Sequence, residues 1–320
     1  MVLKIALKPK HGSGQLAKKV GDEVDLEDNA VALTLFTEIE RATGLKLDRI
    51  RLTVKNEQGP KDHVVQQNEL LKDLSQNGRL TVYYRDLGPQ VDWMTVFIIE
   101  YLGPIVIHLA FFNLREYIYG EEYLPTATQT IMYFCVVMHF FKREYETAYV
   151  HKFSVSTMPL FNLFKNSGHY WLLSGVLLAY FGYAPTSWWT GDAPAWKKFA
   201  FYTGGVIPQE YSLVLPVVWL FAEIGNFAVH QNLSSLRPKG TTERRIPYGF
   251  GFDTLSCPNY FFEFCAWATL TLMTGNWAML LFTIVGTAQM YVWAVKKHRR
   301  YLKEFPDYPK NRKAMFPFLA

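Results

Sequence analysis

The apolar run from Trp93 to Phe112 constrains the fold of this chain more than any other feature. Its length suits a helix that crosses a bilayer, and its tryptophan stands at the start, as interfacial aromatic residues do. Some of the later apolar runs are short or contain Gly or Pro, so we expect about six or seven transmembrane helices. These later runs are roughly 126–141, 168–184, 205–225, 260–274 and 276–295.

The first part of the chain has a different pattern. A helical spacing of apolar residues from Val31 to Ile39 ends at Gly44, a residue that favours a helix C-cap. Four short segments alternate as half-buried strands do: residues 3–7, the stretch to about Leu26, 50–54 and 80–84. This order resembles the ubiquitin-like β-grasp fold. We therefore expect a small α+β domain at 1–86, followed by an all-α multi-pass membrane domain at 87–320.

Two further features concern the start of the chain and the end of the predicted β-grasp domain. Met1 leads directly into a strand-like segment, so we expect no signal peptide. The predicted β-grasp domain has no Gly-Gly end and joins directly to the apolar run, which indicates a fixed appendage rather than a conjugated modifier.

Charge and cysteine content narrow the classes of function. The net charge is +5, and basic clusters at 296–300 and 310–313 follow the last apolar run. These clusters suit a cytoplasmic flank under the positive-inside rule better than nucleic-acid binding. The three cysteines are an odd number without metal-ligand spacing. We therefore expect a cytosolic tail, no nucleic-acid partner and no bound metal.

Polar residues interrupt the apolar runs at two helix positions. Ionisable residues in or beside membrane helices are costly, so a functional role is the default interpretation. The first group is 139–147, continuing to 151–154, and in it Lys142, Glu146 and Thr147 share a helix face. The alternative for this group is a solvated helix end at the membrane surface. The second group is Glu223, Asn226 and His230, one polar stripe that favours a lined cavity over a single core histidine. His230 with Glu223 is too little for a metal site.

Two further groups lie near the end of the chain. Pro258 fits the first turn of a helix in which Asn259 and Glu263 share a face, with Tyr260 one position round. The preceding Gly-x-Gly at 249–251 follows no predicted strand and lacks a third glycine, so a Rossmann site is not supported. The basic tail could be a positive-inside anchor, but an anchor would not need its interleaved tyrosines and prolines.

The tail from Tyr301 to Phe318 resembles the C-terminal signature of the steroid 5α-reductase family. Pro258-Asn259-Tyr260-x-x-Glu263 and Asn226-x-x-x-His230 followed by Leu236-Arg237-x-x-Gly240 match the same family, and the match covers about residues 93–320. Within it, 142–147, 150–154 and the β-grasp domain are similar to the very-long-chain trans-2-enoyl-CoA reductases.

The resemblance implies a reaction and a location. It implies NADPH as hydride donor and a trans-2-enoyl-CoA as acceptor, with hydride going to C3 and a proton to C2. This is the last step of very-long-chain fatty-acid elongation, in the endoplasmic reticulum membrane. The implied active site opens to the cytosol, and the implied partners are membrane lipid and fatty acid elongase components.

The resemblance also suggests roles for residues. Tyr260 is the expected acid or oxyanion donor, and the charge of Lys142 is expected to assist it. Glu100, Arg143 and Glu146 are expected on the substrate side, although Glu100 could equally make a structural hydrogen bond. Asn259 and Glu263 would hold the nicotinamide end. The remaining cofactor-binding residues would be Asn226, His230, Arg237, Arg245, His298, Tyr301, Tyr308, Arg312 and Lys313.

Three alternatives remain open from the sequence. One is a steroid or polyprenol reductase of the same family. Steroid-reducing members carry His-Tyr-Phe-His-Arg where this chain has phenylalanine at 140 in place of the tyrosine, which speaks against a steroid substrate. The others are a membrane methyltransferase that uses S-adenosylmethionine and a non-enzymatic scaffold that carries a ubiquitin-like domain.

Overall fold

The computed structural model describes residues 2–10, 19–56, 62–153, 157–207, 214–237 and 244–318. An N-terminal α/β region is followed by a helical region, as the sequence predicts. The chain forms two compact units. The head unit comprises Met1–Asp92 and Thr157–Asn162, and the helical unit comprises Trp93–Ser156 and Leu163–Ala320.

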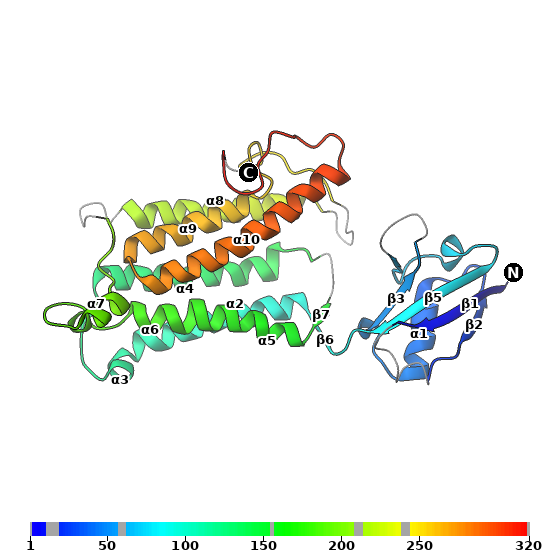
Figure 1. Ribbon diagram of the computed structural model, residues 1–320, viewed down its shortest axis with the longest axis horizontal. Helices are drawn as coiled ribbons and strands as arrows, with labels where there is room; N and C mark the ends of the chain where they lie inside the picture. Colours follow the sequence, from blue (N-terminus) through cyan, green and yellow to red (C-terminus); the bar gives the residue numbers. More distant parts are fainter. Residues whose placement is uncertain are drawn as a thin grey trace. The chain divides into compact units, whose positions relative to one another are not determined.

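The head unit contains a five-stranded sheet with helix α1 (Ala32–Thr43) against it (Figure 1). The strand order is β2-β1-β5-β3-β4, in which β1 pairs parallel to β5 and the other pairs are antiparallel. Short 3₁₀ turns lie at Leu47–Arg49 (η1) and Leu71–Leu74 (η2). The strands are β1 (Val2–Pro9), β2 (Glu23–Glu27), β3 (Ile50–Val54), β4 (His63–Val64) and β5 (Arg79–Asp86).

The core of the head unit follows from the two sequence periods. Leu3, Ile5 and Leu7 of β1 are buried on one face of the sheet, and Leu35 and Ile39 of α1 pack in the same cluster. A sheet with one face on a core shows this alternation. Helix α1 ends at Gly44 in the left-handed conformation (φ 75°), which glycine adopts without steric cost. The predicted strands and helix are confirmed.

The segment that follows β5 forms a separate small sheet. Strand β6 (Gln90–Asp92) pairs antiparallel with β7 (Thr157–Pro159), with Val91 opposite Met158.

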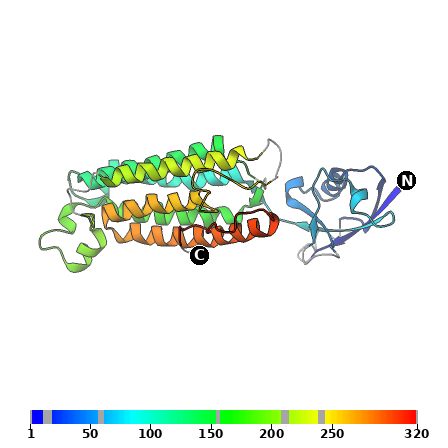
Figure 2. The same ribbon diagram turned by 90° about the horizontal axis from the view of Figure 1, so that it is seen from above.

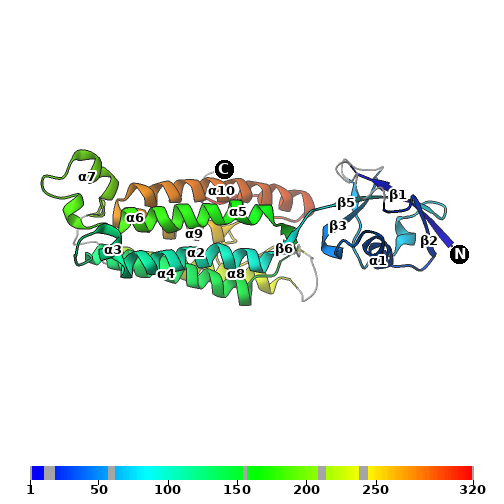
Figure 3. The same cartoon turned by 90° about the horizontal axis from the view of Figure 1, so that it is seen from below.

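The long helices of the helical unit run side by side (Figures 1 and 2), with α8 beside α9, α9 beside α10, and α2 beside α4. The short helices α3 and α7 lie at one end of this unit (Figure 3). The elements are α2 (Trp93–Asn113), α3 (Arg115–Tyr119), α4 (Ala127–Tyr145), π-helical η3 (Glu146–Val150), α5 (Phe161–Gly168), π-helical η4 (His169–Leu177), α6 (Leu178–Gly182), 3₁₀ turn η5 (Thr186–Trp188), α7 (Ala195–Phe201), α8 (Val214–Ser235), α9 (Pro258–Thr274) and α10 (Trp277–Glu304).

Two helices of the described chain, α2 and α10, are long and apolar enough to cross a membrane, with mean hydropathies of 1.9 and 1.6. The sequence predicts about six or seven spans, so four or five of the predicted spans do not meet this criterion. Helix α9 has 17 residues, α4 carries charged side chains at its end, and α8 carries Glu223, Asn226 and His230. The helix predicted at 205–225 also differs, because 205–207 are not helical and α8 extends to Ser235. Residues 208–213 lie outside the described part.

A close approach at Gly103 brings α2 against η4. A Cβ atom at Gly103 would lie 2.0 Å from Nε1 of Trp171. That indole N–H donates a hydrogen bond of 2.9 Å to the carbonyl oxygen of Ile99. The absence of a side chain at Gly103 therefore allows the ring to satisfy a helix carbonyl.

We expect Gly103→Ala to lower the melting temperature of the purified protein, because the added methyl group would displace the Trp171 ring. Overpacking of this kind costs about 1–3 kcal/mol. Gly286→Ala in α10 is the matched control, since a Cβ there would meet no atom within 4 Å. An equal melting temperature for the two variants would contradict the close approach.

Candidate active site

The candidate site is a cavity of about 630 Å³ in the helical unit. It lies where the starts of α2 and α9 meet the ends of α8 and α10 and the residues after η3. Antiparallel packing brings these helix ends together, as the polar groups near predicted helix ends suggested. The lining residues are Trp93, Phe97, His151, Lys152, Phe153, His230, Leu233, Ser234, Leu236, Arg237, Arg244, Arg245, Tyr260, Trp293, Lys296, Lys297, Arg300 and Tyr301.

A buried ion-pair network connects α4, α8 and α9. His139 Nδ1 lies 2.7 Å from Glu223 Oε1, and its Nε2 lies 3.3 Å from Glu263 Oε1. Lys142 Nζ lies 2.6 Å from Glu223 Oε2. The imidazole of His139 therefore bridges two carboxylates from different helices, and Lys142 pairs with one of them.

Asn226 of α8 completes this network. Its Oδ1 accepts a hydrogen bond of 2.6 Å from Lys142, and its Nδ2 donates to the carbonyl oxygen of Asn259 at 2.8 Å and to Glu263 at 3.2 Å. The indole N–H of Trp267 donates to the other oxygen of Glu263 at 3.1 Å. The first turns of α9 are thus attached to α8 through one amide side chain.

A second cluster lies one turn further along the chain, around Glu146, where α4 continues into η3. Arg143 pairs with Glu146 and donates to the hydroxyl of Tyr101 at 3.0 Å, and His230 Nδ1 lies 3.0 Å from Glu146 Oε1. The backbone N–H of His151 bonds to the carbonyl oxygen of Glu146, five residues back, at 2.7 Å. This π-helical turn is a departure from the α-helix that is frequent at functional sites.

Burial decides between the two interpretations of residues 142–147. Glu146 and Thr147 are fully buried, and the side chains of Lys142 and Arg143 are only 16% and 14% exposed. Charges removed from water must be paired, because an unpaired one costs several kcal/mol. The alternative of a solvated helix end is therefore wrong for these residues. Glu223, Asn226 and His230 are likewise buried, as the polar stripe predicts.

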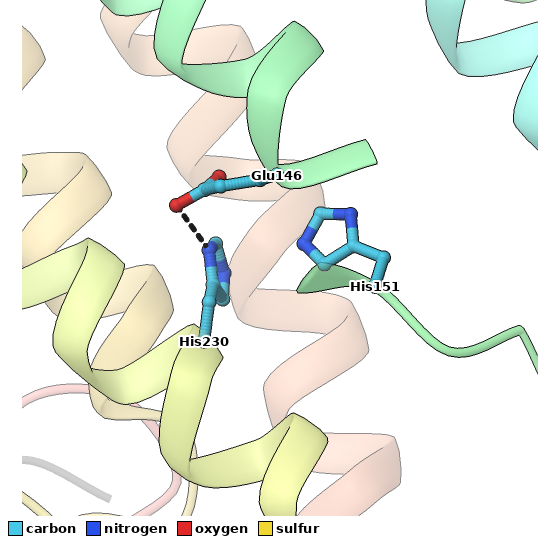
Figure 4. A group of neighbouring side chains, drawn as sticks. All are labelled: Glu146, His151 and His230. Carbon is cyan, nitrogen blue, oxygen red and sulfur yellow. Dashed lines mark ion pairs between the residues drawn. The ribbon is translucent and has the colours of Figure 1, made fainter. Parts of the chain in front are cut away.

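Glu146, His151 and His230 approach one another closely enough to be considered as metal ligands (Figure 4). Their ligand atoms lie within 4.8 Å of one another. Both oxygens of Glu146 already face cations or an imidazole, since Arg143 and His230 pair with them and Lys142 lies 3.8 Å away. Positive charge at this distance opposes a metal cation. We therefore interpret the three side chains as part of the ion-pair network.

The cavity wall combines positive charge with aromatic rings. Seven of its lining residues are lysine or arginine, and none of its described lining residues is acidic. On the α2 side, Phe97 stacks with Trp93 and with Phe153, each at a centroid distance of 5.7 Å. A wall of this composition suits a phosphorylated ligand with a planar base, because cations pair with phosphate and rings stack on a base.

The C-terminal tail packs beside the start of α9. The backbone of Lys313 bonds to Thr254 and Ser256 at 2.8 Å each, and Cys257 donates to the carbonyl oxygen of Ala314 at 3.1 Å. The hydroxyl of Ser256 also contacts His298 and Tyr308, at 2.6 Å each. The tail therefore positions the residues that lead into Pro258.

Arg312 lies inside this packing. It is 2% exposed, donates to the carbonyl oxygen of Pro247 at 2.9 Å, and lies over the rings of Tyr248 and Tyr308. Its guanidinium is not on the described cavity wall. The structure thus gives Arg312 a packing role that the sequence pattern did not suggest.

The predicted site residues fall into four places. His230, Arg237, Arg245, Tyr260 and Tyr301 line the cavity. Lys142, Arg143, Glu146, Asn226, Asn259 and Glu263 form the network behind it. His298, Tyr308, Arg312 and Lys313 belong to the tail packing, in which the Lys313 side chain is exposed. Glu100 is buried in α2, and its Oε1 has no hydrogen-bond partner among the described residues.

The expectation that the charge of Lys142 assists Tyr260 stays a prediction. The ammonium group of Lys142 pairs with Glu223 at 2.6 Å and donates to Asn226 at 2.6 Å. Lys142 therefore lies in the network behind the cavity that Tyr260 lines.

Sequence reasoning gave no site role to several residues that the structure places at the site. His139 lies three positions before Lys142, so helical spacing could have placed it on the same face. Tyr101 directly follows Glu100, but nothing in the sequence places its hydroxyl beside Arg143, 42 residues away. The sequence pattern gave no ligand role to Lys152, Arg244, Lys296, Lys297 or Arg300, and only the folded chain gathers them around one cavity.

The environment of His151 predicts a pH dependence. Burial, followed by the charges of Arg143 and His230, lowers the pKa of His151 to about 3. The unfolded chain, with an ordinary histidine pKa of about 6.5, then binds more protons than the folded chain below that pH. The contribution of His151 to stability is therefore present above about pH 6.5 and is lost as the pH falls toward 3.

We expect the wild-type melting temperature to fall more between pH 7.5 and pH 5 than that of His151→Gln, which cannot take up the proton. Thermal melting at the two pH values measures this. The same decrease in both proteins would show that His151 is not the group concerned.

Comparison with known proteins identifies the family of this chain. The family described as 3-oxo-5-alpha-steroid 4-dehydrogenase matches residues 156–320. The chain is 37% identical to the very-long-chain enoyl-CoA reductase of Dictyostelium discoideum, over 95% of this chain and 97% of the relative. It is 45% identical to a Schizosaccharomyces pombe protein provisionally named an enoyl reductase, over 89% and 90% of the two chains.

A Caenorhabditis elegans protein, provisionally named a very-long-chain enoyl-CoA reductase, is 39% identical over 86% of this chain and 87% of its own. The match therefore extends well beyond the region of the family description, into the N-terminal part. The chain belongs to the 3-oxo-5-alpha-steroid 4-dehydrogenase family of oxidoreductases, in the group of the very-long-chain enoyl-CoA reductases.

Proposed function

We propose that this protein reduces a trans-2-enoyl-CoA to the saturated acyl-CoA with NADPH, the last step of very-long-chain fatty-acid elongation. The observation that carries the proposal is the cavity with seven basic residues and the phenol of Tyr260 on one wall. Both CoA and a dinucleotide bear phosphates, which such a wall can pair with. The names of the relatives point to the same substrate class.

The residues present fit a nicotinamide dinucleotide. Arg237, Arg245 and Lys297 offer cations for phosphate, and Tyr301 offers a ring beside Lys297. Asn259 has a buried Oδ1 that lacks a partner among the described residues, so it can accept a hydrogen bond from a ligand amide. When bound, NADPH supplies the hydride. The adjoining Glu263 and Asn226 hold Asn259 and its helix in place.

The proposed chemistry adds hydride at C3 and a proton at C2 of the enoyl thioester. Negative charge develops on the thioester oxygen during hydride addition, so a hydrogen-bond donor aimed at that oxygen lowers the barrier. Tyr260 is the proposed donor and acid, because its phenol lines the cavity. Lys142 then acts indirectly, through Asn226 and the start of α9.

Other predicted residues take supporting roles in this proposal. Arg143 and Glu146 hold His230, which lines the cavity, and Arg143 also donates to Tyr101. Glu100 is proposed to face the acyl chain. His298, Tyr308 and Arg312 act through the packing of the tail, and Lys313 offers an exposed cation beside it.

We further propose an endoplasmic reticulum location, with α2 and α10 among several spans, and a site that opens to the cytosol. The strand order β2-β1-β5-β3-β4 supports a ubiquitin-like domain at 1–86, and residues 87–320 form the catalytic domain. Fatty acid elongase components are the proposed partners, because this step uses the product of the preceding dehydration.

The decisive experiment follows NADPH oxidation by the purified protein in detergent, with and without a C20-range trans-2-enoyl-CoA. We expect oxidation only with the enoyl-CoA, and a saturated acyl-CoA as product. Activity with a 3-oxo-4-ene steroid but not with the enoyl-CoA would assign the chain to the steroid-reducing members. Stabilisation by S-adenosylmethionine rather than NADPH would point to a methyltransferase.

We expect Tyr260→Phe to fold and bind NADPH but to lose at least about tenfold in kcat, because the acid is removed. Tyr291→Phe is the matched control, since Tyr291 belongs to the same apolar cluster but does not line the cavity. Turnover by Tyr260→Phe within twofold of the control would exclude Tyr260 from the chemistry.

We expect Lys297→Met to raise the KM for NADPH more than the KM for the enoyl-CoA, because a phosphate contact is lost. Lys303→Met, on the same helix but outside the described lining, should leave both constants unchanged. Equal increases in both constants would mean that Lys297 contributes general positive charge rather than a cofactor contact.

A further inference from the structure

The outer face of the head sheet carries a cluster of four cations around Tyr83. Helix α1 buries the inner face, so alternate residues of β1, β3 and β5 point outward. Lys8, Arg51, Lys55 and Arg85 are exposed and lie around Tyr83. We call these four residues the basic face. Among the described residues, none of the four has an ion-pair partner.

Strand register makes this arrangement costly. Arg51 lies directly opposite Arg85 in the antiparallel pair β3–β5, and Lys8 lies opposite Tyr83. Like charges directly opposite each other destabilise a sheet. Two nearby carboxylates that the structure describes are engaged elsewhere, because Asp86 pairs with Arg49 and Asp62 pairs with Lys10. An external anion would relieve the repulsion.

The acidic residues of the same sheet lie elsewhere. Glu27, Asp25 and Glu23 of β2 are opposite Val2, Lys4 and Ala6, and that ladder ends before Lys8. Lys4 and Arg79 also lie opposite each other on this face, at the start of β5, where Asp25 faces Lys4. Near the end of β5, in contrast, no carboxylate of a described strand lies opposite Lys8, Arg51 or Arg85. This is also the end from which the chain continues into α2.

We propose that the basic face binds anionic lipid headgroups on the membrane surface from which α2 enters the bilayer. The inference goes beyond the proposed reaction and rests on α2 being a membrane span. Six residues, 87–92, separate β5 from α2, and a chain of that length reaches at most about 22 Å. Chain connectivity thus keeps the cations close to the headgroups.

A lipid surface fits these observations better than other polyanions. The four side chains lie on the outer face of a sheet, and none of them lines the described cavity. Cytoplasmic leaflets carry anionic lipids that attract clustered lysine and arginine near the surface. The tether supplies a high local concentration of such lipid whenever α2 is inserted, so even a weak surface attraction is sufficient.

The test uses the full chain in nanodiscs of phosphatidylcholine alone and of phosphatidylcholine with about a third phosphatidylserine, a strongly anionic surface. Lys8 and Lys55 report on the face through their rate of acylation by a water-soluble amine reagent, read by mass spectrometry. We expect both rates to fall at least threefold in the anionic nanodiscs and to recover in 0.5 M salt, which screens the attraction. Lys46, exposed but outside this face, should keep its rate.

A charge variant tests whether the protection of Lys8 and Lys55 requires the other cations of the basic face or only the nearness of the membrane. Arg51→Gln with Arg85→Gln removes half of the cluster and the cross-strand repulsion, so the head should fold normally. We expect this variant to lose the lipid-dependent protection of Lys8 and Lys55 while enoyl reduction is unchanged. Arg41→Gln with Lys46→Gln, an equal loss of charge outside the outer face, should keep the protection.

Two outcomes would overturn the proposal. One is equal acylation of Lys8 and Lys55 in the two lipid compositions. The other is protection in neutral nanodiscs by an added acidic peptide, with no response to anionic lipid, which would assign the face to a protein partner. Neither outcome depends on enoyl reduction, so the inference and the proposed function fail separately.

Discussion

The helical unit depends on the pairing of charges that it buries between α4, α8 and α9. Glu146, Glu223 and Glu263 are compensated by Lys142 and Arg143, with His139 bridging two of the carboxylates. Removing one partner from a buried pair costs about 3–5 kcal/mol, so slippage of one helix by a single turn would be strongly unfavourable. The network therefore sets the register of the three helices, and that register brings Tyr260 to the cavity wall.

The same charges explain the hydropathy of the helices. A helix that contributes polar groups to a shared interior site has a lower mean hydropathy than one that faces lipid or apolar neighbours. Thus α2 and α10 are apolar enough to be recognised as spans, whereas α4 and α8 carry the ionisable residues of the network. The positive charge of the chain lies mainly outside the network, around the cavity, on the tail and on the outer face of the head sheet.

The tail shows how packing and function combine in one segment. Its backbone bonds to residues 254–257 hold the entry to α9, and the stacking of Tyr301 on Tyr308 joins α10 to the tail at a centroid distance of 5.1 Å. Arg312, buried beneath Tyr248, stabilises this packing without reaching the cavity. A basic, tyrosine-rich segment can therefore support a phosphate site by positioning its neighbours rather than by direct contact.

The sequence by itself determined the elements that follow from local periodicity. Alternation predicted strands β1, β3 and β5, Gly44 predicted the end of α1, and helical spacing placed Glu223, Asn226 and His230 on one buried face. Only the tertiary structure decided which of these polar groups meet. His139 bridges Glu223 and Glu263, Tyr101 accepts from Arg143, and Lys297 lines the cavity, because such contacts depend on helix packing between distant segments, which periodicity does not encode.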